Sequence, residues 1–326
     1  MLILCRSQRF LVIIAALTVL AACTRSDDQA GIASDVDATM DTLVSAAWLI
    51  EHLDDPDLVV IDATVLVEPD GSGNMLTVNG RANYEAGHIS TAGFADLMGN
   101  LSDGDSPLDF AMPSPEQFAA AMEALGVGDD SRVVLYDSNT LSWAARVWWM
   151  LRWIGFDQAA LLDGGLAAWT AEGGALSTEI VTRPAGKLTV KLRPKLIAYQ
   201  NEVRASIEDD AIILIDALPT PHYRGEWAMY DRPGHISGAI NVPVPSLVDD
   251  AGRFRALDEL DALFESDRDT RTITYCGGGI AAAADAFVMT RLGFTDVAVY
   301  DASLDEWAAD PDNPMDVVLD FDESVD

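Results

Sequence analysis

Short runs of apolar side chains, each ending at a polar residue, recur along the chain and alternate with longer amphipathic stretches. Residues 58–63 and 212–217 are two such runs, and an aspartate stands at the same place in each. Continuous apolar runs of this length are typical of strands that are covered on both faces. Stretches 115–125, 143–154 and 281–292 show helical spacing instead. The alternation predicts an α/β fold, with parallel sheets flanked by helices on both faces.

The chain also repeats itself. Gly87-His88-Ile89-Ser90 returns as Gly234-His235-Ile236-Ser237, and the strand-like stretch 133–137 matches 272–276. The order of the matched segments is preserved while their offset falls from 154 to 138 positions. Loop insertions in a duplicated domain produce this drift, so we predict two similar domains.

The boundaries of these domains follow from the repeats. We place the N-terminal domain at 42–180 and the C-terminal domain at 196–326, with a linker at 181–195 that contains all three lysines of the protein. Trp148, Trp149 and Trp153 are expected in the core or at a domain interface.

The N-terminus has the order of a secretory signal. Two arginines precede an apolar run over 10–20, which is too short to span a bilayer and is followed by a Leu-Ala-Ala box that ends at Cys23. This resembles a bacterial lipoprotein signal. We predict a signal peptide over 1–22, lipidation at Cys23, a tether over 23–41, and a location on the periplasmic face of a bacterial membrane. The alternative is a plain cleaved signal in which Cys23 is incidental.

The amino-acid composition limits the kinds of molecule that this protein can bind. The 326 residues include 20 basic and 53 acidic side chains, a formal charge of −33, yet 49% are hydrophobic, so the chain can bury a core. A field this negative repels nucleic acid and anionic headgroups. We expect no nucleic-acid partner, and membrane contact only through the lipid anchor.

Of the three cysteines, Cys276 is expected to be the free thiol of the mature chain. If Cys5 is removed with the signal and Cys23 is lipidated, Cys276 is alone and no disulfide can form within the mature chain. Cys276 ends a predicted strand and is followed by three glycines and a helix. Such a loop can aim several amides and a helix N-terminus at one atom, which favours thiolate and predicts a nucleophile. The alternative is a small buried hydrophobe.

Other motifs fit this loop less well. Residues 277–282 also match a dinucleotide-binding glycine pattern, but too little chain follows and the matching turn after Asp137 has no glycines. A phosphatase loop would need arginine at Ala282. The four histidines are scattered and no pair of cysteines has metal-ligand spacing. We predict no cofactor and no metal.

Together these residues resemble the tandem-domain rhodanese-like sulfurtransferases, which include thiosulfate and 3-mercaptopyruvate sulfurtransferases. The resemblance is carried in order by the two Gly-His-Ile segments, Arg146-Val147-Trp148-Trp149-Met150, Asp163-Gly164-Gly165, His222-Tyr223-Arg224-Gly225-Glu226, the cysteine loop, and Tyr300-Asp301 with Trp307. It implies a catalytic C-terminal domain and an N-terminal copy with Asp137 in the cysteine position. It also implies that sulfur moves from a small anionic donor, 3-mercaptopyruvate or thiosulfate, through a Cys276 persulfide to a thiol or cyanide acceptor.

The resemblance further implies roles at the site. The backbone amides of the loop would cradle the persulfide, and Arg224 would bind the anionic donor, with a surface ion pair to Glu226 as its alternative. His88 and His235 are expected to be structural. The loop residues concerned are Gly277, Gly278, Gly279, Ile280 and Ala281.

Three positions depart from the family pattern. Leu218 stands where many members have an anion-binding arginine, Gly278 where mercaptopyruvate-preferring members tend to have serine, and Phe110 where they tend to have histidine. The donor therefore stays open. Two other classes also remain: a lipid-anchored binding module without turnover, favoured by Leu218, and a thiol sensor, which would normally need a resolving cysteine.

Overall fold

The computed structural model describes residues 40–71 and 75–318, so the predicted signal peptide and Cys23 lie outside the described residues. The N-terminal copy is built on a five-stranded, fully parallel sheet in the order β1-β8-β7-β2-β6. Its strands are β1 Leu43–Val44, β2 Leu58–Asp62, β6 Gly93–Phe94, β7 Arg132–Tyr136 and β8 Ala159–Leu162.

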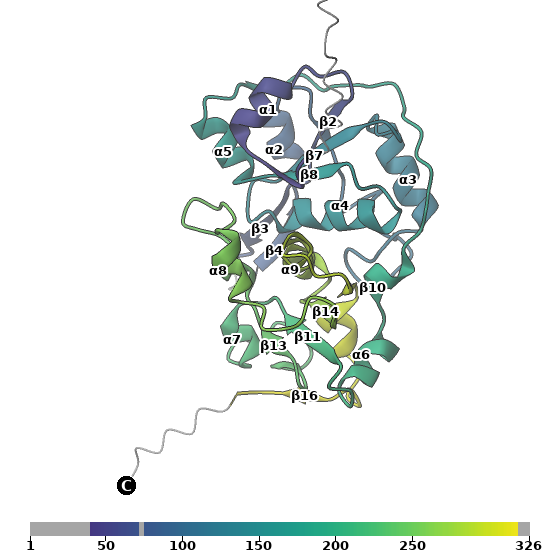
Figure 1. The fold of residues 1–326 in the computed structure, drawn as a ribbon, viewed down its shortest axis with the longest axis vertical. Coiled ribbons are helices and arrows are strands. Elements are labelled where there is room, and N and C mark those ends of the chain that lie inside the picture. The colour runs from purple at the N-terminus through teal and green to yellow at the C-terminus, as the bar shows by residue number, and fades with distance from the viewer. Residues whose placement is uncertain (1–39, 72–74, 319–326) are drawn as a thin grey trace, which may run out of the picture. The chain divides into compact units, whose positions relative to one another are not determined.

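The C-terminal copy repeats this sheet strand for strand, in the order β10-β15-β14-β11-β13, again fully parallel (Figure 1). Its strands are β10 Ile197–Ala198, β11 Ile212–Asp216, β13 Ile240–Asn241, β14 Arg271–Tyr275 and β15 Val297–Tyr300. The central strands are almost entirely buried, as their apolar runs require. The predicted α/β fold with two parallel sheets is confirmed.

Short antiparallel pairs accompany the sheets. β5 His88–Ile89 pairs with β9 Leu176–Ser177, and β12 His235–Ile236 pairs with β16 Met315–Asp316, so this feature is duplicated too. The hairpin of β3 Val65–Pro69 and β4 Met75–Asn79 is described only in the N-terminal copy.

Helices flank both sheets. They are α1 Ala46–His52, α2 Arg81–Ala86, α3 Pro115–Ala124, α4 Ser142–Trp153, α5 Gly165–Ala171, α6 Gln200–Ser206, α7 Thr220–Tyr223, α8 Leu257–Asp261, α9 Ile280–Arg291 and α10 Ser303–Trp307. Local sequence sets their starts: Ser114 caps α3 by accepting the Gln117 amide at 3.1 Å, and proline occupies the first position. None of the helices within the described ranges is long and apolar enough to cross a bilayer.

Helices α4 and α9 join the two copies into one core. They lie side by side (Figure 1), and the Trp148 ring meets Phe287 edge to face with centroids 4.8 Å apart. Trp148, Trp149 and Trp153 are all buried in this shared cluster. The prediction that they belong to the core or an interface is confirmed.

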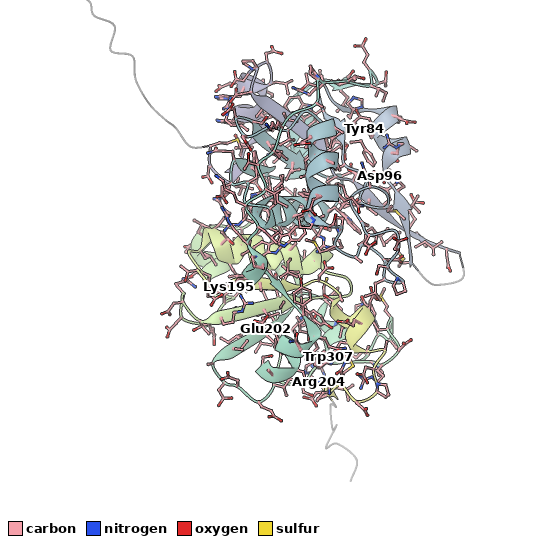
Figure 2. All side chains as sticks on the ribbon, turned by 90° about the vertical axis from the view of Figure 1, so that its right-hand side faces the viewer. Tyr84, Asp96, Lys195, Glu202, Arg204 and Trp307 are labelled. Carbon is pink, nitrogen blue, oxygen red and sulfur yellow. The ribbon has the colours of Figure 1, made fainter. Side chains whose placement is uncertain are left out.

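The segment 181–195, predicted as a linker, runs along the N-terminal copy without a helix until a short 3-10 turn at Pro194–Leu196. The Leu188 amide donates to Glu123 at 2.7 Å, and the Thr189 amide donates to Asp129 at 2.7 Å. Near its end, the Lys195 carbonyl accepts from Arg271, which also binds Glu202. Figure 2 labels Lys195 and Glu202.

A stacked tyrosine–histidine pair, with a buried histidine, is found in each copy. The rings of Tyr84 and His88 stack 3.9 Å apart, and those of Tyr223 and His235 stack 3.8 Å apart. Each histidine Nδ1 also lies within 2.7 Å of its tyrosine's carbonyl oxygen. Both histidines thus brace the turns that precede β5 and β12, as expected for a structural role.

Candidate active site

Cys276 stands between the carboxyl end of β14 and the start of α9. Gly279 caps that helix with φ 74°, a left-handed conformation that favours glycine, and this lets the chain reverse tightly after the cysteine. The thiol is free and the residue is only 2% exposed. In parallel sheets the reactive crevice lies at this strand end, so the fold places Cys276 where chemistry is expected.

The first residues of α10 hold the cysteine loop in place. The buried Ser303 hydroxyl accepts the amides of Cys276 at 3.1 Å and Gly279 at 3.2 Å, and it donates to the Tyr300 carbonyl at 2.6 Å. The Asp305 amide donates to the Gly277 carbonyl at 2.9 Å. The Gly279 amide is predicted from the sequence to bind the persulfide. It donates to Ser303 instead, so this part of the prediction is wrong. Sequence reasoning missed Ser303, although it lies between the quoted Tyr300-Asp301 and Trp307.

The expectation that the loop favours a Cys276 thiolate is not met, because the pKa of the thiol is raised. Burial raises the pKa of the thiol, while the amides of Ala282, Gly278 and Ala281 lower it part of the way, and nearby Asp216 raises it further. Burial also raises the pKa of Asp216 to about 7. The loop does aim amides at sulfur, but desolvation outweighs them, so the resting site holds a thiol.

The equivalent loop in the N-terminal copy surrounds the carboxyl group of Asp137, whose pKa is raised by burial and lowered in part by backbone amides. Asp137 follows β7 as Cys276 follows β14, and its buried carboxylate accepts the amides of Asn139 at 2.8 Å, Leu141 at 3.1 Å and Ala144 at 3.0 Å. Leu141 caps α4 in the left-handed region, as Gly279 caps α9. The same backbone device therefore surrounds a carboxylate in one copy and a thiol in the other.

Two further side chains approach the glycines. A Cβ built on Gly277 would collide with the Tyr230 hydroxyl. A Cβ on Gly278 would lie 3.1 Å from the Asp305 carboxylate and 3.6 Å from the Asp109 carbonyl. A larger residue at Gly277 or Gly278 would therefore displace Tyr230 or Asp305. Sequence reasoning missed all three neighbours because they come from distant segments.

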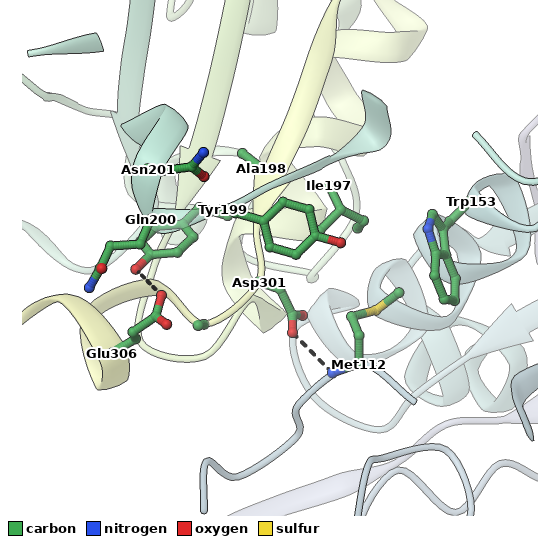
Figure 3. A pocket seen from close by; sticks show the side chains of 11 residues that line it. Met112, Trp153, Ile197, Ala198, Tyr199, Gln200, Asn201, Asp301 and Glu306 are labelled. Atoms are coloured by element: carbon green, nitrogen blue, oxygen red, sulfur yellow. Dashed lines mark hydrogen bonds between the residues drawn. The ribbon is translucent and has the colours of Figure 1, made fainter. Parts of the chain in front are cut away.

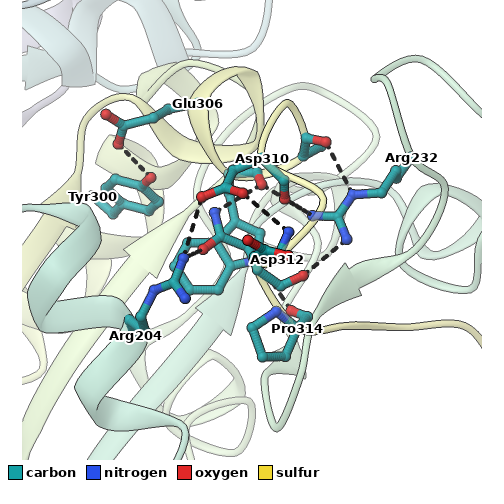
Figure 4. A network of polar contacts seen from close by, with 10 residues as sticks. Arg204, Arg232, Tyr300, Glu306, Asp310, Asp312 and Pro314 are labelled. Atoms are coloured by element: carbon teal, nitrogen blue, oxygen red, sulfur yellow. Dashed lines mark hydrogen bonds and ion pairs between the residues drawn. The ribbon is translucent and has the colours of Figure 1, made fainter.

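A polar network ties the segment of Arg232 to the C-terminal end of α10 (Figure 4). The Arg232 guanidinium donates to four backbone carbonyls at or just beyond the C-terminal end of α10, those of Trp307, Ala308, Asp310 and Asn313, at 2.7–3.1 Å. Arg204 binds the side chains of Asp310 and Asn313 from α6. Since Tyr230 is two residues before Arg232, this clamp fixes the Tyr230 segment against the helix that carries Asp305.

Arg146 connects the N-terminal copy to the cysteine loop. The side chain, 1% exposed, forms an ion pair with Asp301 and donates to the carbonyls of Phe110 at 3.0 Å and Gly279 at 3.5 Å. Asp301 in turn accepts the Met112 amide at 3.0 Å (Figure 3). The guanidinium charge is therefore matched by Asp301, and its donors brace the loop.

A cavity of about 260 Å³ adjoins this ion pair (Figure 3). It is lined by Met112 and Trp153 from the N-terminal copy and by residues 197–201, 300–302 and 306 from the C-terminal copy. Among the described residues that line this cavity, Cys276 and the three glycines that follow it are absent. The cavity adjoins the turn that supports the loop, and it is separate from the thiol.

The other residues singled out from the sequence lie as follows. Arg224 ends α7 and forms an ion pair with Glu226 at 2.7 Å, the arrangement considered as the alternative to donor binding. Leu218 is half-buried, and its amide donates to Asp216 at 2.8 Å. Phe110 packs against Trp143 with ring centroids 5.1 Å apart. Within residues 40–71 and 75–318, no group of three or more metal-ligating side chains comes together.

Comparison with known proteins identifies the family. The model of the rhodanese-like domain matches residues 45–172 and again 199–310, so the chain belongs to the rhodanese-like family and carries two of its domains. It is a sulfurtransferase. The 3-mercaptopyruvate sulfurtransferase of Escherichia coli K12 is 36% identical over 284 residues, which cover 84% of this chain and 98% of the relative.

Two further relatives support this identification. The human 3-mercaptopyruvate sulfurtransferase is 32% identical and covers 81% of this chain and 91% of its own length. The crystal structure of SseA, a 3-mercaptopyruvate sulfotransferase from Escherichia coli, superimposes with a TM-score of 0.72 at 35% identity, covering 81% of this chain and 99% of that one.

Proposed function

We propose that this sulfurtransferase takes a sulfane sulfur from a small anionic donor, holds it as a persulfide on Cys276, and passes it to a thiol or cyanide acceptor. The observation that carries the proposal is the loop of amides at the end of β14. Amides of Gly278, Ala281 and Ala282 act on the sulfur, and their counterparts in the N-terminal copy already hold a carboxylate. A nest whose amides donate to the carboxyl oxygens of Asp137 can donate in the same way to a persulfide anion.

The proposed donor is 3-mercaptopyruvate, ahead of thiosulfate. The curated relatives from Escherichia coli and human carry this activity in their names. Around Gly278 the near neighbours are the Asp305 carboxylate and the Asp109 backbone carbonyl, and residues 277–281 include no lysine or arginine. Because thiosulfate bears two negative charges, it is repelled more strongly than a singly charged mercapto acid.

Mass spectrometry after a single exposure to each donor tests the function. With 3-mercaptopyruvate, the peptide that contains Cys276 should gain the mass of one sulfur, and a following dithiol or cyanide should remove it. Thiosulfate should label the same peptide more slowly. A protein that acquires no sulfur from either donor, or that acquires it on another peptide, would overturn the proposal.

Arg224→Ala is expected to raise KM for 3-mercaptopyruvate about tenfold while leaving kcat within about twofold, because a lost charged hydrogen bond to the donor costs about 1.5 kcal/mol or more. Glu226→Gln is the matched control, since it removes the ion-pair partner and leaves the guanidinium in place. Steady-state kinetics over a range of donor concentrations measures both variants. An unchanged KM in Arg224→Ala would overturn its proposed role in donor binding and favour its ion pair with Glu226 as the alternative.

We also propose export and lipid anchoring at Cys23, on the basis of the apolar run and the Leu-Ala-Ala-Cys box. Expressed in a bacterium that processes lipoproteins, the protein should partition into detergent and begin at a diacylated Cys23. Cys23→Ser should remain unlipidated. Intact-mass analysis decides the matter, and a water-soluble mature chain starting elsewhere would rule the anchor out.

A further inference from the structure

Asp305 lies against the glycine loop. Its carboxylate comes so close to Gly278 that a Cβ there would be 3.1 Å from Oδ2, and its own amide binds the Gly277 carbonyl at 2.9 Å. The helix that carries it is held at its far end by the Arg232 clamp. The side chain is half-buried, so it is both fixed beside the loop and open on one side.

The surroundings of Asp305 tune its acidity. Burial raises the pKa of the carboxyl to about 6, with the negative charge of Asp109 as a second cause. Burial raises the pKa of the Tyr230 hydroxyl, and the charges of nearby Cys276 and Asp305 raise it further, so that group stays neutral. Glu306, next to it on α10, accepts the Tyr300 hydroxyl at 2.6 Å. Near pH 6 to 7, Asp305 can therefore both take and give a proton.

The proposed reaction needs such a group. Cys276 rests as a thiol because of its raised pKa, so its proton must leave before the sulfur attacks. At the other end, the carbon that loses sulfur leaves as an enolate and must gain a proton to become pyruvate. Asp216 also lies near the thiol, but it is fully buried and its carboxylate accepts the Leu218 amide.

We propose that Asp305 transfers the proton of Cys276 to the leaving group during sulfur transfer, an inference that rests on the proposed function. The carboxylate takes the proton from Sγ, and the thiolate attacks the donor sulfur to form the S–S bond. The donor C–S bond breaks and its electron pair passes to the carbon as an enolate, which Asp305 then protonates. The cysteine sulfur is oxidised to a persulfide, the donor carbon is reduced to a methyl group, and no other reactant is required.

The test is the pH dependence of persulfide formation with 3-mercaptopyruvate, followed by rapid quench and mass spectrometry. In the wild type the rate should rise through about pH 6, where Asp305 ionises. Asp305→Asn should lose this rise and be about 100-fold slower at pH 7, the scale of general acid–base catalysis. Asp305→Glu should keep the rise, and Asp109→Asn should move it to lower pH because a neighbouring negative charge is gone.

Two controls separate proton transfer from a structural role. Glu306→Gln removes the same charge from the same helix, and it should leave the pH profile in place. Alkylation of Cys276 by iodoacetamide, a neutral reagent, should not slow in Asp305→Asn, because removing a negative charge beside a thiol does not raise its pKa.

Each outcome separates the inference from the function it rests on. Slow persulfide formation with undiminished alkylation in Asp305→Asn supports the inference. A wild-type profile in this variant, or equal slowing in both assays, overturns it while the sulfurtransferase function stands. A wild-type protein that forms no Cys276 persulfide at any pH overturns the function itself.

Discussion

Cys276→Ser is expected to abolish sulfur transfer, lowering turnover by about 10⁴-fold or more, as removal of a covalent nucleophile does elsewhere. The hydroxyl of serine ionises far less readily than a thiol and forms no persulfide. The loop itself should survive, because its hydrogen bonds run from backbone amides and carbonyls to Ser303 and Asp305. Turnover with 3-mercaptopyruvate and a dithiol acceptor measures the effect, and unchanged thermal unfolding shows that the fold is intact.

Asp137→Ala supplies the contrast from the N-terminal copy. It should leave the chemistry at Cys276 in place, yet lower the free energy of unfolding by about 1–3 kcal/mol, because two buried amides and one partly buried amide lose their acceptor. Asp137→Asn retains an acceptor oxygen and should cost less. Turnover that persists in Cys276→Ser, or sulfur found on any other residue, would contradict a single catalytic copy.

The parts of this protein that could be predicted from sequence are those encoded locally or by repetition. The apolar runs ending at Asp62 and Asp216 mark equivalent strands, and matched segments keep their order, so the duplicated sheet follows directly. The position of Cys276 at a strand end, followed by glycines and a helix, needs only neighbouring residues.

The rest depends on packing between distant segments. Ser303, Asp305 and Tyr230 meet the cysteine loop because β15 lies beside β14 and the Arg232 clamp ties the Tyr230 segment to α10. No local pattern marks those contacts. The sequence also predicts a lowered pKa for Cys276, whereas burial raises it. Amides can be inferred from a glycine loop, but the extent of burial around the sulfur cannot.

Arg146→Met is expected to destabilise the protein by about 3–5 kcal/mol, because it leaves Asp301 without its counterion in a mostly buried site. The donors to Phe110 and Gly279 are lost as well, so the cap of α9 loosens and turnover should fall together with stability. Urea unfolding followed by tryptophan fluorescence measures the first effect, and kcat at a permissive temperature measures the second.

Two comparisons separate the effect of the buried Arg146 charge on stability from that of an ion pair in general. Arg193→Ala breaks a well-formed but exposed ion pair with Asp157 and should cost under about 1 kcal/mol. Combining Arg146→Met with Asp301→Asn should restore part of the lost stability, because the amide carries no charge and can still accept the Met112 amide that Asp301 accepts now. If Arg146→Met were as mild as Arg193→Ala, the ion pair would not be the element that ties the N-terminal copy to the catalytic loop. If the double variant regains stability but not turnover, the loop depends on the guanidinium itself.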